Sequence, residues 1–132
     1  MATIFSKIIQ GQLPCYKVAE NDKFLAFLDI NPIQRGHVLV VSKLEDDYIF
    51  HLPDDYLADM LPFAKRVAKG IEAVVPCKRI AVAVVGLEVP HTHMHLVPIN
   101  QEKDLAFGSH HVQMTPEQME ALRVQIAAHI TL

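Results

Sequence analysis

Apolar residues that recur every three to four positions predict three helices in this chain. Residues 53–75 carry the clearest apolar stripe, with charged side chains outside it. Pro62 interrupts this stretch, so the helix is expected either to kink there or to begin as a separate piece. Residues 3–10 predict a short helix, and the Thr-Pro-Glu-Gln capping signal at 115–118 predicts a C-terminal one. The residues expected to face the core from the long helix are Leu57, Met60, Leu61, Ala64, Val67, Ala68, Ile71, Val74 and Val75.

Shorter apolar segments predict strands between these helices. Residues 17–20 and 23–28 flank Asn21-Asp22 and predict a hairpin with a two-residue turn. Residues 38–41 are all apolar, which predicts burial on both faces of a sheet. Residues 79–85 are also almost entirely apolar and predict a buried central strand.

Composition limits the class of protein. A chain of 132 residues that is 51% hydrophobic can bury a core without disulfides or metal, so we expect one domain over residues 1–132. A net charge of −3 with 12 basic residues argues against nucleic-acid binding. Cys15 and Cys77 are expected to be free thiols in a reducing compartment. Because we find no leader pattern and no apolar run near the roughly 18 residues of a membrane span, we expect a cytoplasmic protein without membrane partners.

Three histidines alternate within residues 89–98. In an extended strand His91, His93 and His95 share one face, with about 6 to 7 Å between successive rings. Pro90 and Pro98 are expected to limit this strand, because proline cannot donate to a ladder. A single histidine is most often an ordinary hydrogen-bonded residue, but three titratable rings on one face point to chemistry.

Two kinds of chemistry fit such a face. A His-x-His pair on a strand can hold zinc, with a third ligand elsewhere and a water in the fourth position. Alternatively, one neutral imidazole can attack phosphorus while its neighbours donate hydrogen bonds to phosphoryl oxygens. The spacing of the histidines alone leaves both open.

The residues around the histidines resemble the histidine-triad (HIT) family. Residues 91–97 fit its pattern of His, any residue, His, hydrophobic, His, hydrophobic, hydrophobic. Blocks at 4–9, 13–14, 24–32 and 36–41 match in order and approximate spacing, so the resemblance covers about the first hundred residues. It implies an α+β fold, with a curved antiparallel sheet of about five strands, one long helix and one or two shorter helices. It also implies a homodimer.

The resemblance also implies a function. By this resemblance the protein would be a HIT-family hydrolase that acts, without a cofactor, at the α-phosphate of purine nucleoside monophosphate derivatives, phosphoramidates in particular. His93 would attack phosphorus and form a covalent nucleotidyl-histidine, His95 and His37 would hold the phosphoryl oxygens, and His91 would orient the nucleophile. Asp29 would accept hydrogen bonds from the ribose hydroxyls. The other nucleotide-binding candidates are Ile4, Phe5, Ile8, Phe27 and Ile30.

The chain departs from the family pattern at two places. Many bacterial relatives hold a structural zinc, but Thr3, Ser6 and Glu45 stand at or near the positions of three of its four ligands, so we expect no metal there. Glu88 stands where relatives of the Hint branch have a serine that handles the leaving group, and it would either contact the departing amine or face solvent. Two further functions stay open, a dinucleoside polyphosphate hydrolase and a nucleotide-binding interaction module with incidental activity.

Overall fold

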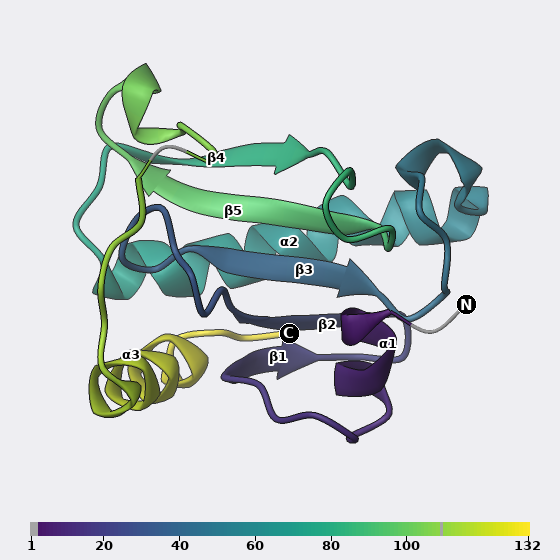
Figure 1. Ribbon diagram of the computed structural model, residues 1–132, viewed down its shortest axis with the longest axis horizontal. Helices are drawn as coiled ribbons and strands as arrows, with labels where there is room; N and C mark the ends of the chain where they lie inside the picture. Colours follow the sequence, from purple (N-terminus) through teal and green to yellow (C-terminus); the bar gives the residue numbers. More distant parts are fainter. Residues whose placement is uncertain (1–2, 109) are drawn as a thin grey trace.

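The computed structural model describes residues 3–108 and 110–132, and its central feature is one antiparallel sheet (Figure 1). The five strands lie in the order β1-β2-β3-β5-β4. They are β1 (Lys17–Glu20), β2 (Phe24–Leu28), β3 (Val38–Ser42), β4 (Arg79–Val84) and β5 (His93–Ile99). The helices are α1 (Ile4–Ile9), α2 (Asp54–Val74) and α3 (Pro116–Ala128), with short 3-10 turns η1 (Ile49–His51) and η2 (Glu102–Asp104). The α+β fold with a five-stranded antiparallel sheet is therefore confirmed.

The two faces of the sheet bury different clusters. On one face, apolar side chains of β2, β3 and β5 pack against α2, which lies behind the sheet in Figure 1, and against α3. On the other face, Leu39 and Val41 of β3 pack with Phe5 of α1. All five residues of β3 are buried, which confirms the prediction of burial on both faces. Since His93 pairs with Val41 and His95 with Leu39, both histidines lie on the α1 face.

The long helix α2 continues without a break through Pro62. Its buried stripe differs from the expected one, because Leu61 is 60% exposed whereas Phe63 and Gly70 are buried. Phe63 follows Met60 by three positions and therefore lies on the same helix face, where its ring packs 5.6 Å from that of Phe24. Among residues 3–108 and 110–132, no helix is long and apolar enough to span a membrane.

The prediction that residues 79–85 form a central strand is wrong. β4 pairs only with β5 and forms an outer edge of the sheet among the described residues. Val82 is 51% exposed and Val85 is 55% exposed. The apolar run misled the prediction because an edge strand can be apolar without being buried by its own chain.

The boundaries of two other elements also differ from expectation. β5 begins at His93 and runs through Pro98 to Ile99. Proline is tolerated there because pairing with β3 ends at Leu96, and only β4 pairs with the rest of the strand. The β1–β2 hairpin is confirmed, but its loop has Lys23 as an additional residue, whose N–H donates to Asn21 Oδ1.

Candidate active site

A close-packed loop brings His37 to the start of β3. Gly36 has φ +92°, a conformation that side chains with a Cβ rarely adopt. A Cβ at this position would also lie 2.9 Å from Val75 Cγ2 and 3.2 Å from Pro98 Cγ. The glycine therefore lets the loop pass close to the end of α2 and leaves His37 buried beneath β5 residue His95.

Hydrogen bonds fix which nitrogen of His37 carries a proton. The Ile33 backbone N–H donates to His37 Nδ1 at 3.2 Å, so in the neutral ring the proton is on Nε2. His37 Nε2 lies 2.9 Å from His95 Nδ1 and donates to it. The Nε2 of neutral His95 then carries a proton that can be donated to a ligand. A backbone amide thus sets the donor direction of two imidazoles.

The opposite pattern holds at His93. Its Nδ1 lies 2.7 Å from the backbone carbonyl of His91, which can only accept, so Nδ1 carries the proton. In the neutral ring Nε2 is then an unprotonated nitrogen with a free lone pair. The centres of the His93 and His95 rings are 5.0 Å apart, closer than the strand repeat predicts, and the ring planes are inclined by 66° to one another. A nucleophilic nitrogen and a hydrogen-bond donor thus lie on neighbouring rings.

Burial keeps these imidazoles neutral near pH 7. It lowers the pKa of His37 from 6.5 to about 4. Burial likewise lowers the pKa of His95 to about 4, with His37 and His93 contributing in the same direction. Burial also lowers the pKa of His93, although the hydrogen bond to the His91 carbonyl and, to a smaller extent, the negative charges of Asp29 and Glu88 oppose this effect. An uncharged His93 is the form that can act as a nucleophile.

The imidazole of His91 packs edge-on to Phe5, with 5.9 Å between ring centres, and both of its nitrogens are engaged by groups outside His93 and His95. It has no exposed surface, and its Nε2 lies 2.6 Å from the carbonyl of Ser42. On the other side its Nδ1 lies 3.0 Å from Thr3 Oγ1. His91 therefore bridges the α1 N-terminus and the end of β3, while its carbonyl accepts a hydrogen bond from His93 Nδ1–H.

An aromatic wall of the site comes from α1 and β2. The Phe5 ring lies edge-on to His93, with 5.0 Å between ring centres, and 5.7 Å from Phe27. Ile8 is partly buried against the same cluster. The structure thus brings Phe5, Ile8 and Phe27 together beside the triad. Ile4 and Ile30 are exposed, Ile30 to 76%, and neither belongs to this buried cluster. Both could therefore contact a ligand only at its solvent-facing side.

Asp29 lies at the end of β2 with one carboxylate oxygen engaged. Its Oδ1 accepts from the Asn31 backbone N–H at 2.8 Å. Its Oδ2 is 3.7 Å from His37 Nε2, a distance too long for a strong hydrogen bond. That second oxygen is available to a ligand hydroxyl on the histidine side of the loop.

Comparison with known proteins identifies the family. A model of the HIT domain matches residues 10–102, which include the triad, His37 and Asp29. The chain belongs to the HIT family. A relative from Schizosaccharomyces pombe named adenosine 5′-monophosphoramidase hnt1 is 38% identical over 136 residues, covering 98% of this chain and 99% of that protein.

More distant HIT proteins extend the likeness. Adenylylsulfatase HINT3 of Arabidopsis thaliana is 31% identical over 111 residues, covering 80% of this chain and 56% of that protein. A solved structure of a hypothetical histidine triad nucleotide-binding protein from Sulfolobus tokodaii matches with a TM-score of 0.82 and 26% identity, covering 95% of this chain and 89% of that one.

The side chains at the HIT zinc positions do not suit the metal. Thr3 and Ser6 offer hydroxyl oxygens, whereas structural zinc is held by thiolates and imidazoles. Ser6 Oγ donates to Glu45 Oε1 at 2.6 Å, and Thr3 Oγ1 contacts His91. A separate group could offer metal-ligand atoms that lie within 4.8 Å of one another, one each from Asp29, His37 and His95. The two imidazoles of this group, however, already share a hydrogen bond.

Two residues of the C-terminal segment lie at the site, although its sequence gave no sign of this. The Phe107 ring is centred 4.6 Å from that of His95 and 6.4 Å from that of His37. His111, expected to be an ordinary surface residue, donates from Nδ1 to the Asn31 carbonyl at 2.8 Å and contributes to lowering the pKa of His37, after burial. No periodicity or spacing around these residues could have identified them.

Glu88 lies in the loop between β4 and the triad and is exposed. Its negative charge acts on His93 by raising the pKa of that ring.

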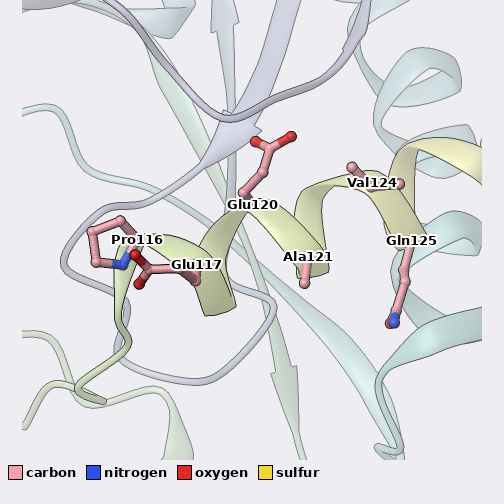
Figure 2. Close-up of a pocket in the computed structure, with 6 residues that line it drawn as sticks. All are labelled: Pro116, Glu117, Glu120, Ala121, Val124 and Gln125. Atoms are coloured by element: carbon pink, nitrogen blue, oxygen red, sulfur yellow. The ribbon is translucent and has the colours of Figure 1, made fainter.

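A groove lies elsewhere on the surface, and Figure 2 shows that its six lining side chains all project from α3. It contains neither a histidine nor any of the predicted site residues.

Proposed function

We propose that this HIT protein is a nucleotide hydrolase that releases a purine nucleoside 5′-monophosphate from derivatives carrying an amine on the α-phosphorus. The observation that carries the proposal is the proton pattern of the site: unprotonated Nε2 on His93 beside protonated Nε2 on His95. The name of the 38% identical relative, an adenosine 5′-monophosphoramidase, supports the same reaction.

In the first step, the lone pair of His93 Nε2 forms a bond to the α-phosphorus. The bond from phosphorus to the leaving nitrogen breaks, and that nitrogen keeps the electron pair and takes a proton from water. His95 Nε2–H donates to a phosphoryl oxygen as negative charge develops on it. His37 was expected to hold a phosphoryl oxygen as well, but it is buried and both of its ring nitrogens are engaged. In this proposal it instead supports the donor through His95 Nδ1.

In the second step, water attacks the phosphorus of the nucleotidyl-histidine. The bond from phosphorus to His93 breaks, the nucleoside monophosphate leaves, and the proton of the water passes to solvent. We assign the base to the wall formed by Phe5, Ile8 and Phe27, with Ile4 and Ile30 at its rim. Asp29 Oδ2 accepts from the ribose, and Glu88 orients the departing amine.

The experiment that tests this function follows AMP release from adenosine 5′-phosphoramidate by the wild type, His93→Ala and His129→Ala, with intact-mass spectra of the same samples. We expect His93→Ala to lower kcat about a thousandfold or more while AMP affinity stays within about tenfold. The surface control His129→Ala should match the wild type. Undiminished turnover by His93→Ala would rule out the assignment, and an added nucleotide mass on the wild type alone would support the covalent step.

The leaving group distinguishes the alternative hydrolases. Adenylyl sulfate and a diadenosine polyphosphate should be compared with the phosphoramidate on one preparation. We expect the highest kcat/KM for the phosphoramidate. Nucleotide binding without turnover of any of the three would favour a binding module instead.

We also propose that the protein is a homodimer in a reducing, cytoplasmic compartment. The outer edge of β4 supports the first part, since Val82 and Val85 expose apolar side chains beside an unpaired strand edge in the described residues. Cys15 and Cys77 are free thiols, which supports the second part.

A further inference from the structure

His91 is connected to the protein surface through a series of polar side chains. Its Nδ1 lies 3.0 Å from Thr3 Oγ1, which lies 3.1 Å from Ser6 Oγ. Ser6 Oγ donates to Glu45 Oε1 at 2.6 Å. His91 and Ser6 are buried, whereas Glu45 is exposed. The connection therefore runs from a solvent-facing carboxylate to a buried imidazole.

The acceptors at both ends determine where the protons lie. The Ser42 carbonyl can only accept, so His91 Nε2 carries a proton and Nδ1 of the neutral ring accepts from the Thr3 hydroxyl. The Glu45 carboxylate likewise accepts the Ser6 hydroxyl proton. The two oxygens also accept the backbone N–H groups of the α1 capping box, Ser6 N–H at Thr3 Oγ1 and Thr3 N–H at Ser6 Oγ. Each hydroxyl thus has a defined donor direction. Because both hydroxyl protons are used in this way, Thr3 and Ser6 are joined by the two N–H bonds of the capping box and not by a hydrogen bond between their oxygens, which lie 3.1 Å apart.

The same histidine holds the nucleophile. The His91 carbonyl lies 2.7 Å from His93 Nδ1 and keeps the proton on that nitrogen. The His91 ring is held from one side by Thr3 and from the other by Ser42. Loss of the Thr3 contact lets the residue shift, and its backbone carbonyl shifts with it. Without that acceptor, the proton of His93 can move to Nε2, which removes the lone pair that attacks phosphorus.

We propose that Thr3 and Ser6, anchored on Glu45, are positioning residues that hold His91 and thereby keep His93 in its nucleophilic tautomer. This inference rests on the proposed hydrolase function, because it assigns a role within that reaction. It extends the set of residues required for turnover to the α1 N-terminus and the loop after β3.

Capping of α1 alone does not account for this arrangement. The N-terminus of α3 has the same kind of capping box, in which Thr115 Oγ1 accepts from Gln118 N–H and Gln118 Oε1 accepts from Thr115 N–H. Among the residues that the structure describes, that box makes no bond to a histidine or a carboxylate. Thr115 is therefore a matched control, in which the loss of a capping hydroxyl has no connection to the triad.

The kinetic experiment compares Thr3→Val, Thr3→Ser, Ser6→Ala and Thr115→Val with the wild type, using adenosine 5′-phosphoramidate. We expect Thr3→Val to lower kcat about tenfold, with KM and the Kd for AMP within about twofold of the wild type. Thr3→Ser keeps the hydroxyl and should restore most of kcat, and Ser6→Ala should give a smaller decrease than Thr3→Val. Thr115→Val should leave kcat unchanged.

A second readout does not depend on turnover. In protein labelled with ¹⁵N at the histidine rings, the His91 Nδ1 resonance, assigned by its loss in His91→Gln, should move in Thr3→Val and stay in Thr115→Val. If the wild type fails to hydrolyse the substrate, the proposed function is wrong, and the ring resonances still test the contact.

Three outcomes would overturn the inference. One is an unchanged kcat in Thr3→Val. Another is an equal decrease in Thr3→Val and Thr115→Val, which would indicate a general loss of stability. The third is an unchanged His91 resonance in Thr3→Val. If Thr3→Val does not fold, Ser6→Ala decides by the same measurements, and an unchanged kcat in that variant overturns the inference.

Discussion

At the scale of single residues, backbone groups decide which histidine nitrogens are protonated. The Ile33 amide acts on His37, and the carbonyls of His91 and Ser42 act on His93 and His91. These groups belong to three separate segments of the chain. The proton pattern is therefore a property of the folded sheet, and the same histidines in an unfolded chain would sample both tautomers.

The lowered pKa of His37 predicts that the protein loses stability in mild acid. The pKa falls from 6.5 to about 4 on folding because the ring is buried. Between these values the unfolded state binds more protons, so the free energy of unfolding rises with pH and is lost as the pH falls from 6.5 towards 4. This group alone should lower the free energy of unfolding by about 2 kcal/mol from pH 7 to pH 5.

Urea unfolding at pH 7 and pH 5 measures this difference. Carboxylates also contribute to acid destabilisation, so the comparison that isolates His37 is between the wild type and His37→Gln, which should lose less stability over this interval. The exposed His110 provides a control, and His110→Gln should keep the dependence of the wild type. The same pH dependence in all three proteins would contradict a buried neutral His37.

Sequence alone could predict the triad residues but not how they interact. Alternation in residues 89–98 correctly put His93 and His95 on one face of a strand, because the strand period is a local property, whereas His91 was also expected in that strand and precedes it. The contacts of His91 with Thr3 and of His95 with Phe107 join positions far apart in the chain. Such contacts leave no local period, which is why Phe107 and His111 were missed.

At the scale of elements, predictions succeeded where a local rule decides the structure. The capping box at Thr115 and Gln118 and the extent of α2 are examples, since both depend on neighbouring residues. The position of β4 in the sheet depends instead on which strands pair. An apolar run does not distinguish a central strand from an edge strand, and the wrong prediction for residues 79–85 follows from this.

Packing of the C-terminal segment against α2 depends on Gly70. A Cβ added there would overlap Ile130 Cγ1 and lie 3.2 Å from the Ile126 carbonyl oxygen. Alanine has the higher helix propensity by about 1 kcal/mol, but we expect the overlap to exceed this gain. Gly70→Ala should therefore lower the free energy of unfolding by about 1 to 3 kcal/mol.

A double-mutant cycle with Ile130→Ala tests the cause. Removal of the Ile130 side chain should reduce the cost of Gly70→Ala by at least half, because the nearest overlapping atom is gone. Denaturant unfolding of the four proteins supplies the cycle. Independent, additive effects of the two substitutions would show that the helix and the C-terminal segment do not meet as described.

At the scale of the whole molecule, the two sheet faces have separate tasks. The face covered by α2, which lies behind the sheet in Figure 1, and by α3 holds the larger apolar cluster. The α1 face carries His93 and His95, which pair with Val41 and Leu39 of the smaller cluster. Because β3 is buried on both faces, its side chains connect the core to the site. Substitutions in the larger cluster should therefore affect stability more directly than chemistry.

The exposed edge of β4 gives the last prediction, which concerns the state of assembly. Val82 pairs with Leu96 in the sheet, yet it is half exposed beside an edge that no other described strand covers. If two copies pair through this edge, Val82→Lys places a charge in the interface and should convert a dimer to a monomer in sedimentation velocity. Val124→Lys changes an equally exposed valine on α3 (Figure 2) and should remain dimeric. A monomeric wild type, or a dimer that persists in Val82→Lys and is lost in Val124→Lys, would place the interface elsewhere or remove it. The dimer prediction thus depends on one edge strand and can fail without affecting the proposed chemistry of the triad.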